Sequence, residues 1–308
     1  MSVLYCVAGH HRPAQFRRLV DTLATGDRHG RMALHYDSRH ALLDPEWVAT
    51  LPQRTTLLPE RALQWGSYGL VELFIEFMNV AANNPDCSYV VFLSGQDYPI
   101  VPLGALEERL GQFDVWMSAT PVDEEPILRH HRARYAYRWH GVLEPNRFQQ
   151  LLYGLSRRIL PGPEFDARPH RFVHMHQGGQ LWWGRRSRTG PGLPVYAGSQ
   201  WMSLSIRAVR LLLGALESET RAVAFLRRVP IADEACLQTV MHSVPGLRWA
   251  PGNARFTRWS PGSGHPEDLS DLDVPDLLAS GDHFARKFDM DADPAVLDTL
   301  DAALGISP

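Results

Sequence analysis

The sequence predicts an α/β fold with a central, mostly parallel sheet, and three observations support this prediction. Residues 89–93 form a continuous apolar run of β-branched and aromatic side chains, which is typical of a strand buried on both faces. Residues 3–8 form a similar run, and helical periodicity follows from Ala14 to Leu23. Strand and helix continue to alternate up to residue 118, as in a doubly wound sheet.

The other elements of the N-terminal part follow the same alternation. Residues 32–39 predict a second strand that ends in an aspartate, and residues 63–73 predict a loop that leads into a helix reaching about Ala82. Ser67 lies just before that helix, where a serine side chain can cap it. Residues 114–118 predict a further short strand.

The second half of the chain is less regular. Residues 119–190 are rich in Arg, His, Trp, Tyr and Pro. They predict either loops whose rings and basic groups bind a sugar, or a solvated basic helix. The clearer elements further on are a turn and strand, a helix, the start of a second helix, a strand and a last helix, at residues 196–205, 206–217, 231–240, 253–259 and 295–304.

The composition is that of a globular protein with a substantial core. The chain has 308 residues, of which 44% are hydrophobic and 21% charged, enough for one large α/β domain or two small ones. A formal net charge of −3 argues against general nucleic-acid binding. Basic side chains are almost all arginine, and Lys287 is the sole lysine.

The cysteines and the N-terminus suggest a soluble protein of a reducing compartment, most simply the cytoplasm. Cys6, Cys87 and Cys236 show no CxxC spacing, so they predict neither a disulfide framework nor a zinc site. The N-terminus lacks a basic region and leads straight into a strand, unlike a signal peptide. No apolar run approaches the roughly 18 residues that a transmembrane helix needs.

Two carboxylates follow predicted strands at the edge where open α/β sheets bind ligands. Asp97 comes directly after the strand at residues 89–93, within the polar turn Ser94–Asp97. It is either a site residue or an Asx-type turn residue. Asp37 ends the second strand and could contact the ribose or base of a nucleotide; the alternative is an ordinary polar strand end.

Further acidic and histidine groups invite a chemical interpretation. Asp233 and Glu234 open the helix at residues 231–240, where they either carry chemistry or cap the helix and balance its dipole. The series Asp289, Asp291 and Asp293 could hold a metal, but it also precedes the last helix and more simply caps it. His174 and His176 have the spacing of a metal-binding pair, without an accompanying carboxylate or cysteine.

The segment Leu93–Ile100, LSGQDYPI, resembles the signature of the core-2/I-branching glycosyltransferase family. That family contains β-1,6-N-acetylglucosaminyltransferases and peptide O-xylosyltransferases. Other matches follow in the expected order along nearly the whole chain, with residues 119–190 the poorest part. They are a strand and H-x-x-P turn at 3–13, H-x-D at 35–37, an aromatic–small–Ser loop at 65–67, G-S-x-W-x-x-L-S at 198–205, Asp-Glu at 233–234 and F-A-R-K-F-D at 284–289.

The resemblance implies a GT-A-like fold with a Rossmann-like nucleotide-binding half. It implies one glycosyltransferase domain, in which residues 1–118 bind the nucleotide sugar and residues 119–308 bind the acceptor and carry catalysis. The expected reaction is inverting transfer of N-acetylglucosamine from a UDP-sugar to a hydroxyl of a glycan or glycosylated acceptor, forming a β-linkage. UDP-xylose is the alternative donor. The animal relatives are anchored in the Golgi membrane, so the chain resembles a bacterial catalytic domain without that anchor.

The resemblance also implies roles for individual residues. Glu234 corresponds to the catalytic base. Arg286 and Lys287 correspond to basic groups that neutralise the diphosphate in place of a metal, so no metal or cofactor is expected. Some family members carry a further Arg before that motif, and here residues 265–268 contain none. Donor contacts are expected from Asp37, Trp65, Ser67, Asp97, Arg286 and Lys287, and acceptor contacts from Ser199, Gln200, Trp201 and Trp259.

Two alternatives come from other functional classes. One is a non-catalytic carbohydrate-binding protein on the same fold, which the presence of Glu234 and Lys287 disfavours. The other is a metal-dependent phosphoesterase that would use the His and Asp clusters. Arg255 and Arg258, on the predicted strand at 253–259, are further candidates for contact with the diphosphate.

Overall fold

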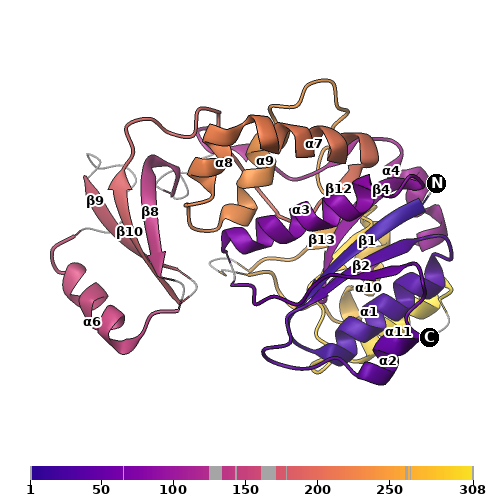
Figure 1. Cartoon of the computed structure of the whole chain (residues 1–308). Helices are drawn as coiled ribbons and strands as arrows, with labels where there is room; N and C mark the ends of the chain where they lie inside the picture. Colours follow the sequence, from indigo (N-terminus) through magenta and orange to yellow (C-terminus); the bar gives the residue numbers. More distant parts are fainter. Residues whose placement is uncertain are drawn as a thin grey trace.

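A computed structural model of the chain has a six-stranded central sheet (Figure 1). The structure describes residues 2–64, 66–124, 134–142, 144–160, 171–177, 179–260, 263 and 265–306. The strand order is β3-β2-β1-β4-β12-β6. The first four run parallel, and β12 is antiparallel to both of its neighbours. The strands are β1 Ser2–Gly9, β2 Arg31–Tyr36, β3 Thr55–Leu57, β4 Cys87–Ser94, β6 Val115–Trp116 and β12 Ser203–Ser205. The predicted α/β class with a mostly parallel sheet is confirmed.

Helices cover both faces of the sheet because alternate residues of each strand point to opposite sides. Val7 of β1 packs with α1 on one face, and Cys6 packs with α3 on the other. The first face carries α1 Pro13–Gly26, α2 Pro45–Thr50, η1 Leu103–Ala105, α4 Leu106–Leu110, α10 Val274–Ala279 and α11 Ala295–Leu304. The second carries α3 Tyr68–Ala82, α7 Ile206–Ser218, α8 Thr220–Leu226 and α9 Cys236–Met241.

Two smaller sheets flank the carboxyl end of β4. Strand β14, Phe284–Arg286, pairs in parallel with β13, Arg255–Thr257, and antiparallel with β5, Tyr98–Pro99. Strand β11, Tyr196–Ala197, pairs with β7, Thr120–Pro121. The pairing of β14 with β5 brings a segment from the second half of the sequence against the turn that follows β4.

A third sheet forms a peripheral lobe, defined here as β8 Tyr137–Val142, α6 Arg147–Ser156, β9 Phe172–Gln177 and β10 Gln180–Arg186. Its strand order is β8-β10-β9, and all pairs are antiparallel. In Figure 1 this lobe lies to the left of the central sheet, with α6 at its outer edge.

The expectation of loops or a basic helix in this region was wrong for β8, β9 and β10, which are strands, whereas α6 is a helix with exposed arginines at its ends. Tyr137 and Trp139 are buried, whereas Arg138 and His140, which alternate with them, are exposed. This alternation is the mark of a strand with one buried face. Residues 125–133, within the same basic segment, lie outside the described residues.

Several local expectations can also be compared with the structure. Ser67 occupies the cap position of α3, but its side chain makes no capping hydrogen bond. Asp293 accepts from the backbone N of Ala295 at the start of α11, while Asp289 pairs instead with Arg12. All three cysteines are free and buried. Among the described residues, no helix has the length and apolar character required to cross a membrane.

Candidate active site at the carboxyl end of β4

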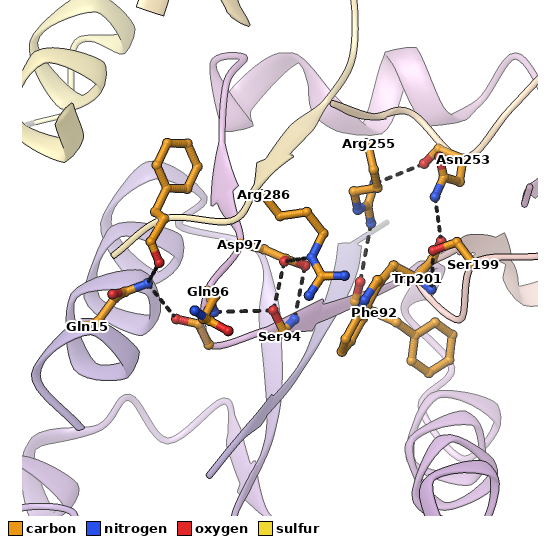
Figure 2. A network of polar contacts seen from close by, with 12 residues as sticks. Gln15, Phe92, Ser94, Gln96, Asp97, Ser199, Trp201, Asn253, Arg255 and Arg286 are labelled. Carbon is orange, nitrogen blue, oxygen red and sulfur yellow. Dashed lines mark hydrogen bonds and ion pairs between the residues drawn. The ribbon is translucent and has the colours of Figure 1, made fainter. Parts of the chain in front are cut away.

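Asp97 is a buried carboxylate at the turn after β4, with 1% of its surface exposed. It accepts hydrogen bonds from the Ser94 backbone N at 3.0 Å and the Ser94 hydroxyl at 2.8 Å. It also accepts one from Arg286 Nε at 2.9 Å (Figure 2). A polar turn after an apolar strand therefore positions an arginine from β14, 189 positions further along the sequence.

Arg286 is held on two sides. Asp97 engages its Nε, and the guanidinium lies over the Trp201 ring with its central carbon 4.9 Å from the ring centroid. Both contacts favour the planar guanidinium over a lysine ammonium. Within the described part of the chain, no protein acceptor engages its Nη atoms. The arginine is thus fixed in direction and keeps donors for an anion.

Lys287 adds a second cation next to Arg286. Its backbone O accepts from Leu269 N at 2.7 Å, which fixes the segment. Burial lowers the pKa of its ammonium, and the neighbouring Arg286 and Arg12 guanidinium groups oppose its charge as well. No carboxylate among the described residues lies within ion-pair distance of it. Lys287, without a described carboxylate at ion-pair distance, and Arg286, which engages its partner Asp97 through Nε, together form a favourable environment for a polyanion.

His10 and His11 lie at the end of the neighbouring strand β1, where the sequence predicted only a turn. Their ring centroids are 4.2 Å apart. Burial, followed by the charge of His11, lowers the pKa of His10 to about 4. Burial and Arg12 lower the pKa of His11, and Lys287 is one of the charges that it senses. The imidazoles are therefore neutral near pH 7, and that of His11 offers an uncharged hydrogen-bonding group in the neighbourhood of Lys287.

Asp37, directly after β2, has both carboxylate oxygens engaged in hydrogen bonds with the protein. Arg39 donates to both carboxylate oxygens, at 3.0 Å to Oδ1 and 2.8 Å to Oδ2, and Leu63 N donates at 2.9 Å. Burial alone would favour the neutral acid, but these donors outweigh it and lower the pKa of Asp37 to about 2. The carboxylate thus holds the loop that leads to α3.

Glu234 lies in the short 3₁₀ turn η3, Ala232–Glu234, just before α9. Its side chain is 39% exposed, and Arg134 Nη1 lies 3.8 Å from its Oε2. Its surroundings desolvate the carboxylate and raise its pKa, while Arg134 acts in the opposite direction. A partly accessible carboxylate with a raised pKa, and a loose ion pair as its contact with the described arginines, is suited to accept a proton.

Asp233 precedes Glu234 in the sequence. It does not cap α9, although helix capping was one of the two roles that the sequence predicted for it. It is 2% exposed, and its Oδ1 has no hydrogen-bond partner within the described residues. Burial and the charge of Glu234 raise the pKa of Asp233 to about 8. The acid is therefore largely protonated at neutral pH.

The loop Gly198–Trp201 contacts both the turn that contains Glu234 and the side chain of Arg286. Gly198 N donates to Glu234 O at 2.9 Å, and Ser199 O accepts from Gln238 Nε2 at 3.0 Å. A Cβ on Gly198 would lie 1.8 Å from Ser118 O, so only glycine allows this approach. Trp201 is 6% exposed and packs on Phe74 as well as under Arg286.

The other predicted site residues lie in different surroundings. Trp259 is 55% exposed beyond β13. The Oε1 of Gln200 is buried without a partner among the described residues. Ser67 begins α3, and Trp65 lies outside the described residues.

The two arginines considered as additional diphosphate contacts are engaged elsewhere. Arg255 is 5% exposed; it donates to Phe92 O and Ser203 Oγ, both at 3.3 Å. Arg258 forms an ion pair with Asp273. These contacts hold Arg255 against β4 and β12 and Arg258 against Asp273, and contact of either arginine with the diphosphate stays a prediction.

Gln15 of α1 connects the site across the sequence. Its amide Nε2 donates to Gly95 O at 3.2 Å and Phe288 O at 2.8 Å (Figure 2). Its Oε1 accepts from Met290 N at 3.0 Å. Phe288 N in turn donates to Gln96 O at 3.0 Å. One buried glutamine thus fastens the turn after β4 to the segment after β14.

The metal interpretations can be compared with the described geometry. In these parts of the chain, no cluster of three or more His, Cys, Asp or Glu side chains could hold a metal ion. His174 and His176 both pack against the Tyr153 ring. Asp289 is paired with Arg12.

Comparisons with known proteins were made for the whole chain. No family model and no curated protein matches it. Among solved structures, the galactosyltransferase LgtC with donor and acceptor sugar analogues is similar at 10% identity and a TM-score of 0.46, covering 100% of this chain and 98% of LgtC. Mouse xyloside xylosyltransferase 1, in its apo form, is similar at 9% identity and a TM-score of 0.41, covering 92% and 97%. Identities and scores are low, and neither likeness assigns an activity to this chain.

Proposed function

We propose that this protein is an inverting, GT-A-like glycosyltransferase that moves a sugar from a UDP-sugar to a hydroxyl of a glycan or glycosylated acceptor. N-acetylglucosamine is the proposed sugar, and the product linkage is β. The observation that carries the proposal is the joining of the Arg286–Lys287 cation pair to the Glu234 turn by the loop Gly198–Trp201. The resemblance to the core-2/I-branching family supports the same reading.

In the proposed reaction the acceptor hydroxyl gives its proton to Glu234. The hydroxyl oxygen forms a bond to the anomeric carbon as the bond from that carbon to the diphosphate breaks. One in-line displacement inverts an α-linked donor to a β-linked product. Arg286 and Lys287 stabilise the negative charge that develops on the departing UDP. Asp97 and Trp201 orient Arg286 for that task.

The two ends of the substrate have separate places in this proposal. Residues 1–118 bind the nucleotide, with Asp37 fixing the loop that contains Trp65 and Ser67. Residues 119–308 bind the acceptor, with Ser199, Gln200 and Trp201 in the connecting loop and Trp259 at the exposed end of β13. Fixed cations supply the charge stabilisation, so transfer is proposed to proceed without a metal.

A panel of UDP-sugars tests the proposal. Purified protein is scored by calorimetry for binding and by release of UDP for hydrolysis or transfer, and UDP-N-acetylglucosamine is expected to give the strongest signal. UDP-xylose as the strongest donor would instead select the xylosyltransferase alternative. Binding of sugars without any UDP release would favour a carbohydrate-binding protein.

Glu234→Gln is the decisive variant, because it preserves shape and removes the base. Loss of a general base typically lowers the rate by about 10²–10⁴-fold. We expect that loss with donor affinity nearly unchanged. Asp298→Asn, on the exposed side of α11, is the matched control. Transfer by Glu234→Gln at the unmutated rate would remove Glu234 from the mechanism.

A further inference from the structure

The helix α6 of the peripheral lobe carries an apolar face that the described protein leaves uncovered. Phe148, Leu151, Leu152 and Leu155 are 66%, 62%, 45% and 47% exposed. At about 100° per residue, these four positions fall within an arc of about 100°. Ile159, in the turn after the helix, is 82% exposed and continues the same line. We call these five residues the α6 apolar face.

The opposite side of α6 is firmly packed, which fixes the direction of the apolar face. Tyr153 is buried against the His174 and Trp183 rings, at centroid distances of 5.4 and 5.7 Å. Trp183 Nε1 also donates to Ser156 Oγ at 3.2 Å. The other face of the same sheet, with Trp139 and Trp182, belongs to the main hydrophobic core. The apolar face therefore points outward, away from the core.

The charge of this region is opposite to that of the rest of the chain. Between residues 129 and 188 the sequence has 12 arginines and only three acidic residues, although the whole chain has a net charge of −3. Arg147, Arg157 and Arg158 are exposed at the ends of α6: Arg147 is its first residue, and the other two follow its last residue. No acidic residue occurs from Pro145 to Pro163.

We infer that the α6 apolar face docks on an anionic lipid surface. An amphipathic helix with bulky apolar side chains and flanking arginines lies in the plane of a membrane interface, where apolar burial and attraction to anionic headgroups act together. A nucleic acid would match the arginines but not the leucines. A second copy of this acidic chain is the other occupant to be tested. The inference is independent of the proposed transferase activity.

Sedimentation with lipid vesicles tests the inference, using the full chain and no sugar substrate. We expect the protein to bind vesicles of phosphatidylglycerol and phosphatidylcholine and to bind pure phosphatidylcholine much more weakly. Leu151→Glu combined with Leu155→Glu should abolish binding. Leu272→Glu, at a 90% exposed leucine of the main body, is the matched control and should bind normally.

A second variant separates charge from apolar contact. Arg157→Gln combined with Arg158→Gln should lower vesicle affinity about fivefold for each arginine removed. Leu151, Leu155, Arg157 and Arg158 are all exposed. The melting temperatures of both double variants should therefore stay close to that of the unmutated protein.

Three outcomes would overturn the inference. One is absence of vesicle binding by the unmutated protein. Another is undiminished binding by the double glutamate variant, because adsorption would then rest on charge alone. The third is a dimer in sedimentation velocity that the glutamate variant dissociates without any vesicle binding, because the face would then pair two copies of the chain.

Discussion

Asp97 and Glu234 are two carboxylates connected through one loop, and their surroundings differ in almost every respect. Asp97 is 1% exposed and accepts three hydrogen bonds, one of them from Arg286. Glu234 has a 39% exposed side chain, and its one ion pair with a described residue, Arg134, spans 3.8 Å. A saturated carboxylate serves to orient its partner, whereas an unsaturated one is free to exchange a proton. The difference separates a structural acid from a candidate base more clearly than the residue type does.

The largest effect expected from this comparison is on stability. Asp97→Asn removes one member of a buried ion pair and leaves Arg286 without its counter-charge, which typically costs about 3–5 kcal/mol. Glu234→Gln should change the free energy of unfolding by no more than about 0.5 kcal/mol, as is usual for partly exposed sites. Urea denaturation of both variants measures the contrast. Equal losses in the two variants would contradict the assignment of different roles.

Lys287→Ala is expected to lower turnover by about 10²–10³-fold, the usual effect of removing one group that stabilises developing charge. Arg258→Ala is the matched control, because that arginine is paired with Asp273.

Transfer by the unmutated protein should persist in EDTA. Inactivation by EDTA that Mn²⁺ reverses would show that a metal, rather than these cations, neutralises the diphosphate.

Asp233 predicts a pH-dependent stability of a particular sign. An acid whose pKa is about 8 when folded, against an ordinary value near 4, keeps its proton in the folded state. The unfolded chain loses that proton first as the pH rises, so the folded protein becomes less stable between about pH 4 and pH 8. Asp233→Asn should therefore melt several degrees above the unmutated protein at pH 8. The two should melt alike at pH 4, and a constant difference at every pH would contradict this explanation.

The smallest expected effect concerns Arg134, which lowers the pKa of Glu234. Arg134→Gln should move the acidic limb of kcat/KM to higher pH, by less than about one unit because the pair is partly exposed. Arg138→Gln, an exposed arginine of β8, is the control and should leave the profile unchanged. A shift to lower pH, or none, would indicate that Arg134 does not act on the group that titrates.

The sequence was most informative where local pattern and tertiary role coincide. The apolar run at residues 89–93 is followed at once by Asp97, and both became the centre of the sheet and of the site. The proximity of Arg134 to Glu234 could not be predicted, because residues 100 positions apart meet only through the fold. His10 and His11 resembled an ordinary turn, since nothing local indicated the cations that approach from β14.

The peripheral lobe shows a different reason for failure. Arg138 and His140 alternate with Tyr137 and Trp139, and this alternation was a strand signal hidden by the basic composition. Packing between strands could not be predicted from the sequence. Gly141 lies opposite Trp182, and a Cβ on Gly141 would come within 2.4 Å of the indole. A glycine matched to a tryptophan on another strand leaves no trace in the residues next to either one.

The hydrogen bonds of Gln15 also have a consequence for the order in which parts of the site form during synthesis. The helix that carries this glutamine leaves the ribosome before its partner Phe288, which is added 273 positions later. Until then, the turn after β4 lacks both Arg286 and the strand that carries it. The proposed diphosphate-binding pair Arg286 and Lys287 can therefore assemble against the turn after β4 only once residue 288 has been synthesised.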